Sequence, residues 1–284
     1  MGEVSMGGRA IVRRFKRWVI ISLGISMLAV SSSVLSCGPI KQTPETTTTE
    51  GPPFSNADYY NLDENPDDYI GRQGTVYGQI SNIVEYTDGS ADVIILPDIG
   101  LVPRAFLLKA KSKGNLIKGD FVKATGEFAG LEQVGILGEE PAIEVTKIEK
   151  VDPFIAIPIM TPPIKVVTVK QTKNQQGFIV TLEKIDFTED HTRAYIRVKN
   201  ESPDEVSLFA SSASAVQGSR QFETEPTIAD LPTLPSDILP SIEAQEVVVF
   251  ERLDIESKQA RFVFEGSSEN FDIDIEPFAF EVTW

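Results

Sequence analysis

Apolar and polar residues alternate along most of the chain after Gly74, and this period of two predicts β-strands rather than helices. Turn residues, such as Thr87-Asp88-Gly89-Ser90, separate the alternating segments. Many short strands at this spacing predict an all-β protein built from barrels or sandwiches. The expected strands cover residues 75–84, 92–96, 104–109, 118–128 and 142–151, then 165–170, 178–187, 192–199, 206–210, 213–224, 246–251, 260–265 and 271–282.

The first five expected strands form a domain at residues 55–152. Gly78 lies inside the first of them, and a glycine there indicates a bend. The five strands, the connection at 110–117 and the run Lys-Gly-Asp-Phe-Val-Lys-Ala-Thr-Gly at 118–126 resemble an OB-fold barrel over residues 68–152. The resemblance implies a face that binds oligonucleotides or oligosaccharides, although a fold alone does not fix a function.

The remaining strands predict an immunoglobulin-like β-sandwich at residues 164–284, after a Pro-rich connector at 153–163. The segments 195–202, 206–208 and 239–250, with the pattern Val-x-Asn-x-Ser at 198–202, resemble the telokin-like, immunoglobulin-like domain of bacterial surface lipoproteins of unknown function. That family shares no catalytic residues, so the resemblance implies none here. The Pro-rich stretch 225–240 is long for a loop, and we expect either a binding loop or a crossover.

The first 36 residues are typical of a secretion signal. Residues 9–17 hold five basic side chains, residues 18–30 are uncharged and apolar, and small residues follow. The tetrad Val34-Leu35-Ser36-Cys37 resembles the lipobox of bacterial lipoproteins. The resemblance implies cleavage between Ser36 and Cys37 and attachment of a thioether-linked diacylglycerol to Cys37, which is the only cysteine of the chain.

Lipidation would anchor the protein outside the cytoplasm. Each buried methylene contributes about 0.8 kcal/mol, and stable anchoring takes at least two acyl chains. Residues 37–54 are rich in Thr and Pro, and we expect a disordered stalk that holds the domains off the membrane of a bacterial cell envelope. Two alternatives are an uncleaved anchor, because residues 18–36 are long enough for a short membrane span, and a cleaved secreted protein.

Composition narrows the function. The formal net charge is −16, and removal of residues 1–36 leaves 21 basic and 41 acidic side chains. Because the protein as a whole is strongly anionic, we do not expect it to bind nucleic acid. One cysteine and one histidine exclude an internal disulfide and a Cys- or His-rich metal site. We therefore expect no cofactor and no metal.

Three sets of residues were considered for chemistry. His191 is the only histidine, and its position between charged residues predicts a solvated turn. Asp272, Asp274 and Glu276 would share one face of a strand, which predicts a solvated face, with a calcium site or catalysis as alternatives. A basic segment with nearby aromatic residues, Tyr77, Tyr86, Phe106 and Phe121, could hold single-stranded nucleic acid on the barrel; its basic residues are Arg104, Lys109, Lys111, Lys113, Lys118 and Lys123.

Taken together, the sequence favours a non-catalytic, membrane-anchored envelope lipoprotein that binds a protein or glycan partner. A first alternative is an envelope hydrolase that uses Asp272, Asp274 and Glu276. A second is binding of extracellular nucleic acid through the barrel, which is disfavoured because residues 55–152 hold 9 basic against 17 acidic side chains.

Overall fold

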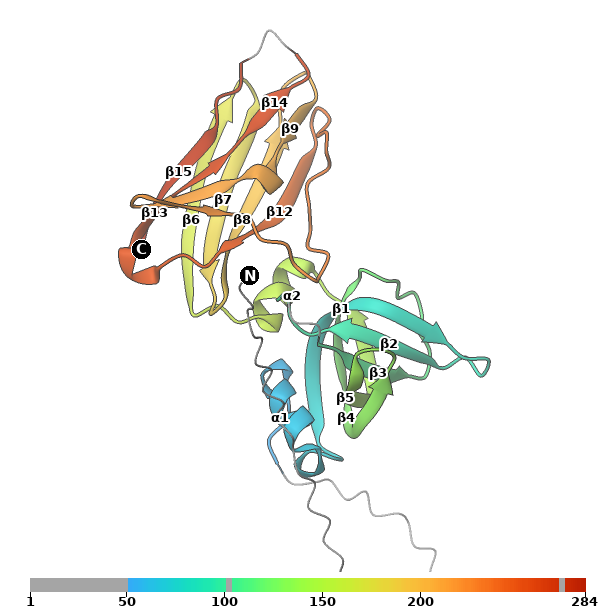
Figure 1. Cartoon of the computed structure of the whole chain (residues 1–284). Coiled ribbons are helices and arrows are strands. Elements are labelled where there is room, and N and C mark those ends of the chain that lie inside the picture. The colour runs from blue at the N-terminus through green and yellow to red at the C-terminus, as the bar shows by residue number, and fades with distance from the viewer. Residues whose placement is uncertain (1–50, 101–103, 271–273) are drawn as a thin grey trace, which may run out of the picture. The chain divides into compact units, whose positions relative to one another are not determined.

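The structure is a computed structural model, and it describes residues 51–100, 104–270 and 274–284 (Figure 1). These residues belong to one compact unit. They are mostly β-strand, so the all-β prediction is confirmed. The expected signal peptide, the cleavage site at Ser36, the lipidated Cys37 and most of the stalk lie outside the described residues.

Five strands form a closed barrel in the order β1-β2-β3-β5-β4, which returns to β1. Strands β3 and β5 are parallel and the other neighbours are antiparallel. This is the five-stranded barrel that the OB-like prediction requires. The strands are β1 (Gln73–Glu85), β2 (Ala91–Leu96), β3 (Phe106–Ala110), β4 (Phe121–Val134) and β5 (Gly138–Lys150).

Gly78 lies where a side chain would not fit. A Cβ atom there would lie 2.7 Å from the main-chain oxygen of Leu96 on β2. Two positions further on, the β1–β2 register shifts between Ile80 and Asn82. The glycine that the sequence marked as a bend therefore lies in a strand that is bent to close the barrel.

A short helical segment before β1 closes one part of the barrel core. It contains η1 (Asn56–Asp58), α1 (Tyr59–Glu64) and η2 (Pro66–Asp68). The side chains of Phe54, Tyr59 and Leu62 are buried in the barrel core. The backbone of Phe54 also pairs with that of Gly74. The prediction that the disordered stalk extends to residue 54 is therefore wrong at this residue. The reason is its aromatic ring, which packs edge-on against Phe128 of β4.

The Pro-rich connector is a helix, α2 (Pro153–Met160), rather than an extended segment. The side chain of Asp152 accepts a hydrogen bond from the main-chain N–H of Phe154 at 2.8 Å and caps the first turn. Pro153 is tolerated because the first helical residue has no intrahelical N–H partner to lose. Ala156, Ile157 and Met160 are buried, whereas Ile155 and Ile159 are exposed.

The C-terminal part is a sandwich of two four-stranded sheets, in the orders β12-β8-β7-β6 and β11-β10-β13-β15, with a short β14-β9 pair. The immunoglobulin-like prediction is confirmed at the level of architecture. The strands are β6 (Lys165–Gln175), β7 (Phe178–Phe187), β8 (His191–Asn200), β9 (Val206–Leu208), β10 (Ser214–Gln217), β11 (Arg220–Glu223), β12 (Glu243–Glu251), β13 (Gln259–Phe264), β14 (Gly266–Ser268) and β15 (Phe278–Thr283).

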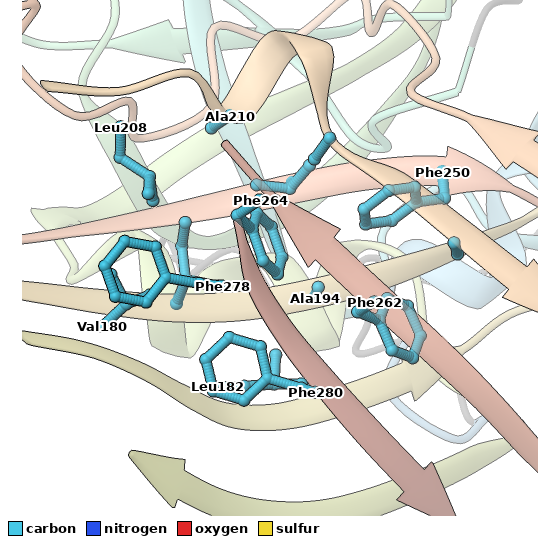
Figure 2. Packing of buried hydrophobic residues seen from close by; sticks show 14 of the residues in the cluster. Val180, Leu182, Ala194, Leu208, Ala210, Phe250, Phe262, Phe264, Phe278 and Phe280 are labelled. Atoms are coloured by element: carbon cyan, nitrogen blue, oxygen red, sulfur yellow. The ribbon is translucent and has the colours of Figure 1, made fainter. Parts of the chain in front are cut away.

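The two sheets share an aromatic core (Figure 2). Phe250 of β12 packs edge-on against Phe262 and Phe264 of β13, and Phe264 packs against Phe280 of β15. Val180, Leu182 and Ala194, from β7 and β8, belong to the same buried cluster. Phenylalanine has no polar group to satisfy, so it fills this interior without a hydrogen-bonding cost. Two single-turn helices, η3 (Ala210–Ser212) and η4 (Ile255–Ser257), complete the described elements.

The Val-x-Asn-x-Ser pattern forms a buried turn that holds the 225–240 crossover. Asn200 donates hydrogen bonds to the main-chain oxygens of Ile238 at 2.7 Å and Asp204 at 2.8 Å. Its side-chain oxygen accepts from the N–H and the hydroxyl of Ser202. Through the hydrogen bond to Ile238, the motif therefore holds in place the stretch between β11 and β12.

Two of the expected strands differ most from the structure. Residues 213–224 form the hairpin β10–β11, which turns through Gly218 at φ 63°. Residues 274–277 are not in a strand, and β15 begins only at Phe278. Pro277 explains the second difference, because proline has no N–H to donate to a sheet.

Candidate functional site

A cleft of about 950 Å³ lies in the described part of the chain. Six segments that are distant in sequence line it. They are η1 with the start of α1, the loop after β2, the link from α2 to β6, the β7–β8 turn, the first residues after β11, and Val249 of β12. Barrel and sandwich therefore both contribute walls. A concave site of this size with convergent polar groups is the usual form of a ligand site.

The walls are held by a hydrogen-bonded clasp between the barrel and the crossover. Gln79 of β1 donates from Nε2 to the main-chain oxygen of Asp230 at 2.6 Å, and its Oε1 accepts from the N–H of Asp230 at 2.7 Å. Gln79 is only 3% exposed. An amide side chain that satisfies both main-chain groups of one residue fixes that residue as a strand neighbour would.

An apolar cluster surrounds this clasp. Phe121 of the barrel, Ile157 of α2, Ala229 of the crossover and Val247 of β12 are buried in it together. Apolar burial shared by barrel, helix and sandwich resists relative movement, because separation would expose all of these side chains. The cleft is therefore formed before any ligand arrives.

A buried arginine, Arg193, holds a second part of the cleft wall through hydrogen bonds. Arg193 of β8 is fully buried and donates from Nη1 to the oxygen of Ile157 at 3.3 Å and from Nη2 to that of Thr161 at 2.9 Å. Its charge is balanced by Asp186, also fully buried, at 3.4 Å. Lys184 donates to both oxygens of Asp186. The link from α2 to β6, which lines the cleft, is thus held by the sheet below it.

On the barrel side, Arg104 organises the cleft wall. Its guanidinium pairs with Asp98 at 3.1 Å and lies 4.2 Å from the centre of the Tyr60 ring. Burial raises the pKa of Asp98, while a hydrogen bond from the N–H of Gly100 acts in the opposite direction. Tyr60 remains 54% exposed and can contact a ligand. Neighbouring Tyr59 donates to the buried Glu140, and burial is the main cause of its raised pKa.

The facing wall is acidic. Glu189 and Asp190 belong to the β7–β8 turn, and Glu225 follows β11. The pKa of Glu225 is raised by burial and by the negative charges of Glu251 and Asp190. Asp190 also raises the pKa of Asp98. Carboxylates from three separate segments therefore repel one another across this cleft.

His191 is not a solvated turn residue, and this corrects the sequence prediction. It is the first residue of β8, only 5% exposed, and lines the cleft. Its main-chain N–H donates to the Thr188 hydroxyl, which in turn donates to the His191 oxygen. Burial, followed by the charge of Arg193, lowers its pKa to about 4, so the imidazole is neutral at pH 7.

Acidic side chains lie beside several basic residues of the barrel segment, and Tyr86, Lys109 and Lys111 line a hollow together with Asp92, Glu132 and Glu144. Arg104 pairs with Asp98, Lys109 with Glu132 and Lys113 with Glu85, so acidic neighbours offset these charges. Phe106 and Phe121 are buried and cannot stack on a base, and Tyr86 donates to Asp92. These contacts favour the prediction that nucleic acid is not the ligand.

The acidic row that the sequence singled out is not assembled as expected. Asp272 lies outside the described residues, and Asp274 and Glu276 are exposed on a segment that is not a strand. The main chain of Glu276 instead bonds the side chain of Gln175, at 2.7 and 2.9 Å. Among residues 51–100, 104–270 and 274–284, no group of three His, Cys, Asp or Glu side chains is arranged to hold a metal ion.

Sequence reasoning missed most of the cleft. Asp98, Arg104 and Glu225 were not brought together by any spacing, because they come from parts of the chain that meet only in the folded state. One signal was available: the unusual Pro-rich stretch after residue 224 proved to carry both a cleft wall and the clasp to Gln79.

Comparisons with known proteins show distant structural likeness and no family. No family model matches the chain, and no curated protein matches it. Among solved structures, the chain is similar to a functionally unknown protein from Listeria monocytogenes EGD-e, with a TM-score of 0.32 and 9% identity over 44% of this chain and 86% of that one. So low a score assigns neither family nor function. In the part of the chain that the structure describes, none of the helices is long and apolar enough to cross a membrane.

Proposed function

We propose that this protein is a lipid-anchored, extracytoplasmic binding protein of a bacterial envelope, and that the cleft between barrel and sandwich is its ligand site. The lipobox-like tetrad ending in Cys37 and the basic-then-apolar segment before it support the anchor. The resemblance of the C-terminal domain to the telokin-like domain of surface lipoproteins is consistent with this location.

The binding function is supported chiefly by the cleft, because hydrogen bonds hold the surrounding segments in place. The Gln79–Asp230 clasp and the buried Arg193 hold its walls from two sides. A preformed site loses little conformational entropy on binding, so a modest contact area can give useful affinity. The partner is a protein or a glycan, since both can be recognised by aromatic, carboxylate and main-chain groups of the kind that line this cleft.

A hydrolase is the second candidate, because Asp98 and Glu225 are both cleft carboxyls with raised pKa values. Glycoside hydrolysis in other proteins uses a carboxyl group whose raised pKa keeps it protonated as the general acid. Against this role, Asp98 is already paired with Arg104 and accepts the N–H of Gly100. Release of reducing sugar from envelope polysaccharide, lost in Glu225→Gln, would favour the hydrolase over the binding protein.

The anchor is tested by Cys37→Ala. We expect wild-type protein in the membrane fraction with an acylated N-terminal cysteine by mass spectrometry, and the variant in the soluble envelope fraction. Cys37→Ser serves as a size-matched control and should behave as the alanine variant does. Equal membrane retention of all three proteins would contradict lipid anchoring.

The binding function is tested by crosslinking the full chain in host envelopes and recovering its neighbours. The double variant Tyr60→Ala/Asp190→Asn changes two cleft residues with substantial surface exposure. Tyr86→Ala/Asp274→Asn makes the same two chemical changes at residues that do not line the cleft. We expect the first variant alone to lose its crosslinked partner.

A further inference from the structure

The cleft has an uncompensated negative charge. Its lining contains four carboxylates, Asp98, Glu189, Asp190 and Glu225, and one guanidinium, that of Arg104. Asp98 already takes the guanidinium as its partner. Within the described ranges, with their gaps at 101–103 and 271–273, the other three carboxylates have no basic side chain within 4.0 Å.

The fold holds these charges close although they repel. Asp190 on the β7–β8 turn acts electrostatically on Asp98 from the β2–β3 loop and on Glu225 after β11. Like charges that converge from separate elements cost free energy in the empty site. A bound cation would relieve this repulsion, and the gain would be available only to a cationic ligand.

His191 independently points to a ligand at this cleft. Its side chain is more than nine-tenths buried against the same cleft, and its Nε2 has no hydrogen-bond partner in the part of the chain that is described. Buried polar atoms are nearly always paired. The ring is neutral, so it does not itself offset the carboxylates, and a neutral imidazole can accept a hydrogen bond from a donor-rich ligand.

The geometry selects an organic cation over a metal ion. Metal binding needs three or more ligands around one point, and no such group of His, Cys, Asp or Glu occurs in residues 51–100, 104–270 or 274–284. Ammonium and guanidinium groups carry several donors and can be held by more widely spaced carboxylates.

The borders of the cleft are apolar. Ile164, which is 57% exposed, lies on one border, next to Pro162 and Pro163. Tyr60 is exposed as well, with the Arg104 guanidinium over its ring. Aliphatic side chains pack against such a border more favourably than the hydroxyl-covered surface of most sugars.

We propose that the cleft takes a lysine or arginine side chain, with aliphatic neighbours, from an extended segment of a partner protein. This inference rests on the proposed binding function and specifies its ligand. The basic group lies among Glu189, Asp190 and Glu225, and the aliphatic residues contact Ile164 and Tyr60. The Asp98–Arg104 pair remains intact and shapes the barrel wall.

Fluorescence anisotropy of the full chain in a neutral detergent tests the proposal. The probes are a labelled Lys-Val-Lys-Val-Lys peptide, its Gln-for-Lys and Glu-for-Lys counterparts, and an N-acetylglucosamine oligosaccharide. Because the whole protein is acidic, the decisive comparison is between two double variants of equal charge. Asp190→Asn/Glu225→Gln lies in the cleft, and Asp274→Asn/Glu269→Gln lies on exposed residues that do not line it.

We expect only the lysine peptide to bind, with affinity that falls as salt rises. The cleft variant should weaken binding by roughly tenfold, and the control variant by less than about twofold. Neither variant should lower the melting temperature, and the cleft variant should raise it slightly, because it removes repulsion between Asp190 and Glu225. Equal weakening by the two variants would reduce the interaction to general charge attraction and overturn the proposal.

Two other outcomes separate this inference from the binding function beneath it. Oligosaccharide binding that only the cleft variant loses would leave a binding protein but reject the cationic ligand. Failure of every probe, together with recovery of a partner by crosslinking that Asp190→Asn/Glu225→Gln does not weaken, would also reject it. Failure of crosslinking as well would reject the proposed function itself.

Discussion

Arg193 donates a hydrogen bond of 2.9 Å to the main-chain oxygen of Thr161, the C-cap residue that follows α2. The same guanidinium reaches the Ile157 oxygen one turn earlier. A cation at the C-terminal end of a helix is favourable because the last carbonyl groups have no intrahelical partners. A side chain buried in the sandwich thus fixes the course of the connector and, with it, one wall of the cleft.

Arg193→Met should strongly destabilise the protein. It removes the donor to two main-chain oxygens and leaves Asp186 buried with only Lys184 beside it. Breaking one side of a buried ion pair typically costs about 3–5 kcal/mol. Urea unfolding at pH 7 measures the loss. Arg261→Met, at an exposed pair with Glu281, should cost less than about 1 kcal/mol.

The double variant Arg193→Met/Asp186→Leu distinguishes charge from packing. Because it removes both members of the buried pair, it should regain part of the stability lost in the single variant. A double variant that is less stable than Arg193→Met would show that Asp186 contributes independently of Arg193.

Gln79→Leu should loosen the crossover without unfolding the barrel. Leucine fills a similar volume but leaves the N–H and oxygen of Asp230 without their partner. These hydrogen bonds are part-buried, so we expect their loss to cost about 1 kcal/mol. Hydrogen exchange should rise in peptides that contain Asp230. The exposed Gln221, changed to Leu, should leave exchange there unchanged, and a rise in both variants would contradict a specific clasp.

His191 should destabilise the fold as the solution becomes acidic. Its pKa in the folded protein is about 4, below the ordinary value of 6.5, so the unfolded chain binds the proton more readily. Above pH 6.5 the ring is neutral in both states, so the free energy of unfolding is at its full value. It falls by about 3 kcal/mol as the pH drops to 4, because the unfolded chain takes up the proton first. His191→Gln should lack this fall.

The titration itself can be observed directly. The chain has one histidine, so a single imidazole resonance in a proton NMR titration belongs to His191. A midpoint near 6.5 in the folded protein would contradict the burial described above.

Glu246 should act in the opposite direction. Burial raises the pKa of this carboxyl to about 7, although the N–H of Leu234 donates to it. The folded state then binds the proton more tightly than the unfolded state, so stability is highest below pH 4.5 and falls as the pH rises towards 7. Glu246→Gln should therefore be more stable than wild type at pH 8, by about 3 kcal/mol, and equal to it at pH 4.

The control for this prediction lies on the same strand. Glu243 begins β12 and is exposed beside Arg197, so Glu243→Gln should shift the urea midpoint little at either pH. If Glu246→Gln were less stable than wild type at pH 8, the carboxylate would be a net stabilising group.

The strands could be predicted because their signals are local. The expected segment 178–187 matches β7, and the glycine at 78 marks a close approach between β1 and β2. Pro277 was a local signal too, and it outweighs the alternation around it. In a half-buried strand, apolar and polar residues alternate, and this alternation shows which side chains face the core.

The cleft and the burial of His191 could not be predicted in the same way. Glu189-Asp190-His191 is a polar turn by composition, yet the imidazole is covered by elements far away in sequence. Ile157 presented a similar difficulty, because whether an apolar Pro-rich run is extended or helical depended on the cap at Asp152 and on Arg193 beneath it. These are tertiary contacts, which no local spacing encodes.

The seating of Phe54 has a mechanical consequence. A pull on the chain from its N-terminal side reaches the Phe54–Gly74 bridge before any other strand of the barrel. The bridge is parallel, and the Phe54 ring is embedded beside Phe128, so the load falls on a few hydrogen bonds and one aromatic contact. Under tension from the N-terminal side, these contacts would therefore be the first in the barrel to bear the load.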